Sequence, residues 1–168
     1  NLVQTPEGTV KVIQKASKGD GIDLVFLGDA FTSKMISDGF FDQAVSDAVE
    51  AFFSIPPVDG LREYFNIYSV SVPSISSDYS SGSITAFGCW YAEGKKVGGN
   101  DYRCRDCTVE VVSKERIEDA VTIVLMNSER YGGTSYLYPP SSGQYGRGWA
   151  VSYIPLCADP EDFTFLVR

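Results

Sequence analysis

The sequence predicts an α/β domain built on a mixed sheet with one long crossover helix. Two nearly continuous apolar runs, residues 22–27 and 121–126, are rich in strand-forming residues, which is typical of strands covered on both faces. A helical pattern follows the first run, and an alternating strand pattern follows at 66–73. A strand, a helix and a second strand in this order form a crossover unit.

The remaining elements follow from local patterns. Residues 9–14 alternate weakly before a glycine-containing turn, which predicts a short or peripheral strand. Beginning at Thr32 or Ser33, apolar residues recur at helical spacing up to Phe52, and the prolines that follow end the segment, so one long helix is expected. Residues 149–154 alternate as a strand does.

A last helix begins near Asp159. The Asp can cap free amides, Pro160 lacks only an N–H that the first turn does not use, and two acids follow at the positive end of the dipole. Because one or two turns do not repay the cost of nucleation, we expect this helix to continue past Arg168 in a longer parent protein. Residues 1–168 form a single domain with long loops at 74–108 and 128–148.

Bulk properties disfavour two classes of partner. The net charge is -8, with 14 Lys and Arg against 22 Asp and Glu, and the basic residues form no stripe that could neutralise a phosphate backbone. We therefore expect no nucleic-acid partner. No apolar run approaches the roughly 20 residues of a membrane-spanning helix, so no membrane-spanning segment is expected in this sequence either.

The four cysteines leave several chemistries open. Cys104 and Cys107 have the two-residue spacing of a zinc knuckle or a redox pair, but no second pair and no histidine complete a familiar metal site. We expect at least one disulfide, because one or two disulfides pinning a long loop would fit an oxidising compartment; four buried thiols are the other interpretation. Pairing cannot be deduced from the sequence, so the candidate disulfide residues are Cys89, Cys104, Cys107 and Cys157.

Asp29 follows the first buried strand, at the sheet edge where open α/β sheets place ligands. The segment from Asp29 to Ser33 invites comparison with the adhesion-type metal site of von Willebrand A domains, but Phe31 offers no oxygen to a hard cation. The other interpretation is that Asp29 caps the following helix or ties down a loop. Tyrosines in the late loop either line a groove or pack that loop onto the domain.

With no histidine and no Gly-x-Ser-x-Gly elbow, a serine or cysteine hydrolase confined to these residues is disfavoured, and no phosphate-cradling loop is present. Instead, ordered segments from about Lys18 to Arg168 resemble the IgA-cleaving zinc metallopeptidase family, named for its clostridial member and common in gut Bacteroides. These segments are Ile22-Asp-Leu-Val-Phe-Leu-Gly-Asp29, the long helix, Leu61-Arg-Glu-Tyr-Phe-Asn-Ile-Tyr68, Val124-Leu-Met-Asn-Ser128, Tyr131-Gly-Gly133 and Asp162-Phe-Thr-Phe-Leu-Val-Arg168. The insertion at 89–107 departs from the family pattern.

The resemblance implies a zincin-like mixed sheet, cut at the start of the active-site helix. In that family a helix beginning like Asp162–Arg168 continues into His-Glu-x-x-His, whose histidines bind zinc and whose Glu activates the metal's water. None of these groups is in this chain, so no catalytic or metal residue and no cofactor are expected here. The full-length protein is expected to hold zinc and to hydrolyse a protein or glycoprotein, while this segment alone is inactive.

The resemblance also implies that an extended substrate binds along an edge strand through backbone hydrogen bonds. By position, strand 149–154 is the candidate, and glycines near its rim would let a substrate backbone approach closely. The expected substrate-binding residues are therefore Tyr131, Gly132, Gly133, Trp149, Val151 and Tyr153.

The expected location is secreted or periplasmic, with surface anchoring as a variant of it. The alternative function is a non-catalytic extracellular domain that binds a ligand or carbohydrate through Asp29 and the tyrosine-rich loop. A shortened final helix also uncovers apolar area, and self-association through it would be an artefact.

Overall fold

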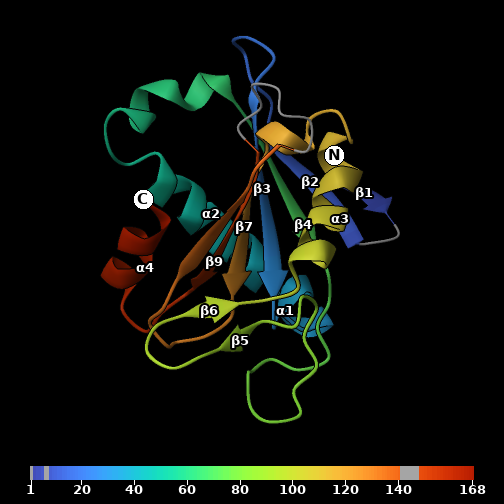
Figure 1. Ribbon diagram of the computed structural model, residues 1–168, viewed down its shortest axis with the longest axis vertical. Helices are drawn as coiled ribbons and strands as arrows, with labels where there is room; N and C mark the ends of the chain where they lie inside the picture. Colours follow the sequence, from blue (N-terminus) through green and yellow to red (C-terminus); the bar gives the residue numbers. More distant parts are fainter. Residues whose placement is uncertain (1, 6–7, 141–147) are drawn as a thin grey trace.

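The computed structural model describes residues 2–5, 8–140 and 148–168. One mixed sheet lies between two helical layers (Figure 1). The central strands β4, β3, β7 and β9 run parallel, whereas β1, β2 and β8 each pair antiparallel with their neighbours. Across the sheet the order is β1 (Leu2–Thr5), β2 (Gly8–Gln14), β4 (Phe65–Ser71), β3 (Ile22–Asp29), β7 (Val121–Met126), β9 (Trp149–Pro155) and β8 (Thr134–Tyr138).

Helices cover both faces of the sheet. The helical segments are α1 (Ser33–Ser37), α2 (Phe40–Phe52), α3 (Asp101–Val112) and α4 (Pro160–Val167), with the 3₁₀ helices η1 (Val58–Tyr64) and η2 (Ile117–Asp119). Side chains of α2 and α4 share one core cluster with the sheet, and α3 shares the other with the segment 86–97. A short hairpin, β5 (Trp90–Tyr91) and β6 (Val97–Gly98), lies beyond one end of the main sheet (Figure 1).

Strand β3 shows why the central strands are apolar on both sides. Leu24 and Phe26 are fully buried against α2, and Val25 and Leu27 are fully buried on the α3 side. Burial of one such side chain contributes about 1.5–3 kcal/mol. The predicted mixed α/β sheet is therefore confirmed, including two-sided burial at 22–27 and 121–126.

The predicted helix from Thr32 to Phe52 is wrong in its continuity. Thr32 does cap a helix, since its hydroxyl accepts a hydrogen bond from the Met35 N–H at 3.3 Å. The chain then breaks at Gly39, whose φ of 87° lies in the left-handed region. Glycine adopts that conformation without a Cβ penalty, so α1 ends there and α2 starts in a new direction.

Both predicted long loops contain regular structure. Helix α3 occupies 101–112 within and beyond the expected loop 74–108, and its buried side includes Cys104, Cys107 and Thr108. Strand β8 lies inside the expected loop 128–148, of which residues 141–147 fall outside the described residues. Small polar and sulfur-containing side chains form the inner face of α3, so the apolar spacing that indicates a helix is weak there.

The alternating pattern at 66–73 predicts a half-buried strand, and for β4 this prediction is wrong. Its residues 65–70 are all buried, because α2 covers the face that carries Ile67 and Ser69, and α3 with segment 86–97 covers the face of Tyr68. The polar Asn66 is accommodated by hydrogen bonds: its Nδ2 donates to Asp23 Oδ1 at 2.9 Å, and its Oδ1 accepts from the Ala16 N–H at 2.9 Å.

The carboxylate of Asp23 joins two distant parts of the chain. It is 3% exposed and accepts from Arg116 Nε at 2.5 Å, while the Arg116 guanidinium also donates to the Gly21 carbonyl at 2.7 Å. The hydrogen bond with Asp23 raises the pKa of Arg116. This group anchors the segment between α3 and β7 to the beginning of β3.

Asp29 is fully buried and ties down a loop, as one of the two interpretations of this residue predicted. Its carboxylate accepts from the Phe87 N–H at 2.6 Å and the Cys89 N–H at 3.3 Å. Its carbonyl accepts from the Tyr79 hydroxyl at 3.2 Å. Since 0% of the residue is exposed, the Asp29 carboxylate does not reach solvent in this structure.

We expect Asp29→Ala to lower the free energy of unfolding by about 3 kcal/mol, because it leaves two buried N–H groups without their acceptor, each worth about 1–3 kcal/mol. Urea denaturation measures the difference. The exposed Asp106→Ala, on the outer side of α3, is the matched control and should change stability by less than about 0.5 kcal/mol. Equal stabilities of the two variants would contradict the structural role of Asp29.

Arg116→Met is expected to destabilise the fold by about 3 kcal/mol, since breaking a buried pair costs about 3–5 kcal/mol and this arginine is partly exposed. A double-mutant cycle with Asp23→Asn tests the pairing. The coupling energy should exceed about 1 kcal/mol, the range found for groups in one hydrogen-bonded network. Additive effects of the two substitutions would show that the pair does not act as one unit.

Candidate functional site

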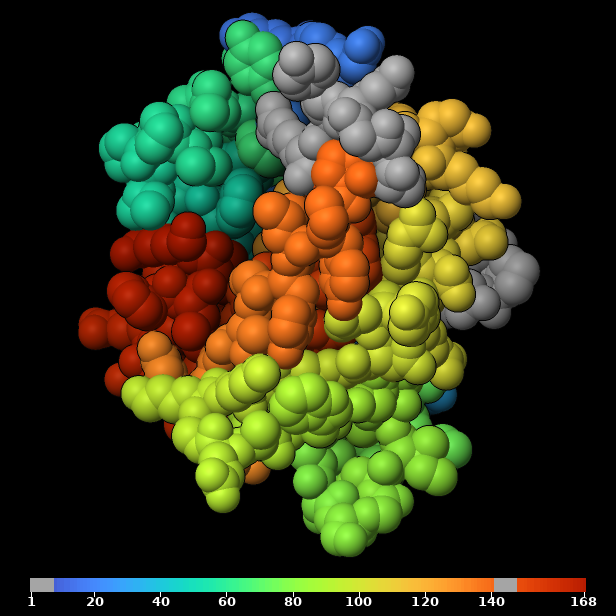
Figure 2. Space-filling view, viewed as in Figure 1, coloured from blue at the N-terminus to red at the C-terminus, as the bar shows by residue number. Residues whose placement is uncertain are grey.

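Strand β8 forms one edge of the sheet and leaves one side open. It pairs with β9 over its whole length, from Thr134 opposite Tyr153 to Tyr138 opposite Trp149. No other strand in the described part of the chain pairs with it. Figure 2 shows this segment, in orange, crossing the surface between α4 in red and α3 in yellow.

The register identifies which backbone groups face the open side. The Ala150 N–H donates to the Ala120 carbonyl at 3.4 Å and the Leu156 N–H to the Met126 carbonyl at 3.0 Å, so even-numbered residues of β9 point toward β7. Odd-numbered residues therefore point toward β8 and bond with Thr134, Tyr136 and Tyr138. The N–H and C=O groups of Ser135 and Leu137 face away from β9. An extended peptide can add to the sheet there.

The prediction that strand 149–154 forms the edge is wrong. Strand β9 is flanked by β7 and β8, and the side chains of Trp149, Val151 and Tyr153 are 4%, 0% and 0% exposed. They face α3 rather than a substrate. Trp149 Nε1 donates to Thr122 Oγ1 at 3.0 Å, and Thr122 in turn shares a 2.8 Å hydrogen bond with Thr108.

Residues Tyr131, Gly132 and Gly133 do lie at the rim of the edge strand, directly before it, but they contact the chain itself. The Gly133 N–H donates to the Lys95 carbonyl at 3.1 Å, and the Lys95 ammonium lies 4.3 Å from the centre of the Tyr131 ring. A Cβ on Gly132 would come within 2.7 Å of the Lys95 carbonyl oxygen. At Gly132 the close approach that glycine permits is made by the turn of the β5–β6 hairpin.

The missed residue of this region is Asp101, at the start of α3. Its two carboxylate oxygens accept hydrogen bonds from the hydroxyls of Tyr138 and Tyr153. The hydrogen bond to Asp101 raises the pKa of Tyr138 to about 12. Burial, with Cys104 and Asp101 nearby, raises the pKa of Tyr153. Only a capping signal, the Asn100 that bonds the Arg103 N–H at 3.1 Å, marked this helix start in the sequence.

Beside Asp101 lies a mainly aromatic hollow of about 280 Å³. Its walls come from the first turns of α3 and from the two strands nearest the edge, and Tyr138 stacks on Trp149 with ring centres 5.3 Å apart. The lining residues are Asp101, Tyr102, Arg105, Tyr138 and Trp149.

The cysteines form no disulfide in the described part of the chain. Cys89, Cys104 and Cys107 are buried and Cys157 is half-buried. Burial raises the pKa of Cys89 and of Cys104, which keeps both protonated near neutral pH. Protonated thiols are poor metal ligands and poor nucleophiles.

In the described ranges 2–5, 8–140 and 148–168 the possible metal ligands are Asp, Glu and Cys side chains, since the sequence has no histidine. No cluster of three or more His, Cys, Asp or Glu side chains there has the arrangement to hold a metal ion. Cys104 and Cys107 instead face the core from α3, and Cys104 Sγ lies 3.6 Å from the Tyr153 hydroxyl. The residues described here therefore do not fit a zinc site.

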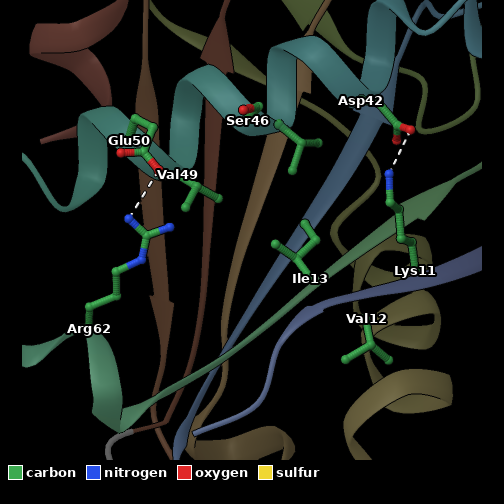
Figure 3. A pocket seen from close by; sticks show the side chains of 9 residues that line it. Lys11, Val12, Ile13, Asp42, Ser46, Val49, Glu50 and Arg62 are labelled. Atoms are coloured by element: carbon green, nitrogen blue, oxygen red, sulfur yellow. Dashed lines mark hydrogen bonds and ion pairs between the residues drawn. The ribbon is translucent and has the colours of Figure 1, made fainter. Parts of the chain in front are cut away.

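A second groove lies far from β8, between β2 and α2 (Figure 3). Its apolar floor includes Val49, and an ion pair closes each end: Lys11 with Asp42 at 2.7 Å, and Arg62 with Glu50 at 3.0 Å. All four charged side chains are more than 40% exposed. Exposed pairs of this kind contribute about 0–1 kcal/mol, so they mark a solvated surface rather than a reactive site.

Within the described residues, every helix is too short or too polar to serve as a membrane span. No family model matches the sequence, and no curated protein matches it.

Proposed function

We propose that this chain is the substrate-binding part of a secreted zinc-dependent endopeptidase, and that its zinc ligands follow Arg168 in the full-length protein. The main support for this proposal is the exposed antiparallel edge strand β8. It lies next to α4, the helix that the family resemblance assigns to the active site. The resemblance of the ordered segments from Lys18 to Arg168 supports the same function.

Strand β8 and helix α4 are close neighbours. A Cβ on Gly133 would lie 3.2 Å from Leu166 Cδ2, so the beginning of the strand touches the helix. Helix α4 is fixed at its start by the Asp159 side chain, which accepts from the Glu161 N–H at 2.8 Å. Near its end, the Arg168 side chain donates to Ser54 Oγ at 3.0 Å. Residues that continue this helix would extend from a firmly packed turn.

The residues of this chain bind and orient the substrate in the proposal. An extended peptide pairs with Ser135 and Leu137, whose backbone groups face away from β9 and meet no other strand among the described residues. Such pairing fixes the peptide backbone in one direction and register, and positioning of this kind lowers the entropic part of a barrier. Zinc, when bound by the full-length protein, would polarise the scissile carbonyl and activate water.

The first test compares the 168-residue chain with the full-length protein, using an unstructured protein such as reduced casein as substrate. With added zinc, the full-length protein should cleave it, and a chelator should abolish cleavage. The 168-residue chain should remain inactive because its described residues supply no zinc ligand set. Chelator-sensitive cleavage by the short chain, or an inactive full-length protein, would refute the proposal.

The second test concerns the edge strand in the full-length protein. Leu137→Pro removes an N–H that faces the open side and leaves the hydrogen bonds between β8 and β9 in place. An edge strand tolerates proline at such a position. We expect kcat/KM to fall about tenfold, the effect of losing a hydrogen bond of about 1.4 kcal/mol. Measurement of cleavage kinetics and of the unfolding midpoint separates a binding defect from a folding defect.

The matched control is Leu137→Ala, which retains the backbone N–H and shortens a side chain that is already 68% exposed. Its kcat/KM should stay within about threefold of the wild type, because one exposed side chain contributes little. If both variants lose activity equally, the side chain rather than the backbone of β8 contacts the substrate.

A further inference from the structure

The hollow beside β8 combines ring faces with charged edges. The stacked pair Tyr138 and Trp149 forms one wall, and Tyr102, which is 85% exposed, stands at the opening. Aromatic faces bind apolar faces of a ligand, and the tyrosine hydroxyls keep polar partners within reach. The hollow measures about 280 Å³, slightly below the roughly 300–1,000 Å³ of pockets for drug-sized ligands. One ring therefore fits it better than an extended molecule.

Two ionic side chains one helical turn apart lie at this hollow. Asp101 is held in place by the hydroxyls of Tyr138 and Tyr153, which occupy one site on each carboxylate oxygen and leave further lone pairs free to accept. Arg105 forms no salt bridge with any side chain in the described part of the chain. The hollow thus offers one fixed acceptor and a group of donors beside an aromatic wall.

This combination selects against a purely apolar occupant. A phenyl or alkyl group would stack on the rings but would take water from Asp101 and Arg105 without replacing its hydrogen bonds, which costs about 1–3 kcal/mol per group. Asp101 repels an anionic occupant and Arg105 repels a cationic one, so a charged ligand is favoured by only one of the two side chains. A neutral sugar ring satisfies every part: its C–H face packs on the exposed ring of Tyr138, which covers Trp149, and its hydroxyls donate to Asp101 and accept from Arg105.

We propose that the hollow formed by Asp101, Tyr102, Arg105, Tyr138 and Trp149 binds one neutral monosaccharide unit. The role of this site rests on the proposed peptidase function. Tyr138 is the last residue of the edge strand, so a peptide paired with β8 can place a glycosylated side chain in the hollow. The substrate class is then a glycoprotein, with the sugar recognised beside the peptide backbone.

The test uses the 168-residue chain and needs no peptidase activity. Methyl glycosides of galactose, N-acetylgalactosamine and N-acetylglucosamine are titrated at millimolar concentration while the indole N–H signals of the two tryptophans are followed by NMR. Trp149 lines the hollow and Trp90 does not. At least one sugar should shift the Trp149 signal in a saturable manner and leave the Trp90 signal in place.

Two variants locate the binding, and a third controls for the helix. Tyr102→Ala and Arg105→Ala are exposed changes that leave the core intact, and each should weaken sugar binding about tenfold. Asp106→Ala changes the neighbouring exposed residue, which does not line the hollow, and should leave binding unchanged.

Absence of a Trp149 shift with all three sugars would overturn the proposal. It would also be overturned if N-acetylphenylalaninamide shifted Trp149 while the sugars did not, because the hollow would then be a pocket for an aromatic side chain. Unchanged sugar binding by both Tyr102→Ala and Arg105→Ala would contradict it equally. Each of these results leaves the proposed cleavage by the full-length protein to be decided by its own assay.

Discussion

The face of the sheet opposite α2 has to be covered by a chain segment that enters from a loop, and a single buried carboxylate holds that segment in place. Strands β3 and β7 carry large apolar side chains on both faces. Helix α2 covers one face directly, as the crossover requires, but α3 reaches the other only after the long excursion that begins at residue 74. Asp29 binds that excursion by its backbone at Phe87 and Cys89, close to the end of β3. The position of α3, and with it the hollow next to β8, depends on this attachment.

The central elements could be predicted because their sequence patterns have one physical reading. A run such as 22–27 has too many large apolar side chains to leave either face in water, and Asp159 followed by Pro160 is compatible with few conformations other than a helix start. By contrast, α3 turns Cys104, Cys107 and Thr108 toward the core. These side chains are small enough to pack against β7, but they carry little of the apolar periodicity by which a helix is recognised.

The candidate site was harder to predict because strand order is a property of the whole sheet. Strands 149–154 and 134–138 both alternate, and nothing local states which of them lies outside. Of these two strands, β9 is the one that pairs with β7, in parallel, and β8 pairs with the other side of β9. Trp149 and Tyr153 of β9 fill the space under α3. The glycines at 132 and 133 were correctly placed near the rim, yet the neighbour that needs their missing Cβ atoms is the hairpin turn at Lys95 and the helix α4.

The bond of Asp101 to two tyrosines has a mechanical consequence. Tyr138 is the last residue of the edge strand β8, and Tyr153 belongs to the neighbouring strand β9. The Asp101 carboxylate therefore holds the end of β8 through a side chain, in addition to the backbone pairing of β8 with β9. The end of an edge strand normally frays, because half of the strand's backbone N–H and C=O groups bond only to water. In this structure the end of β8 is bonded to α3. A peptide that pairs with β8 therefore meets a strand that is already ordered, so less conformational entropy is lost on binding.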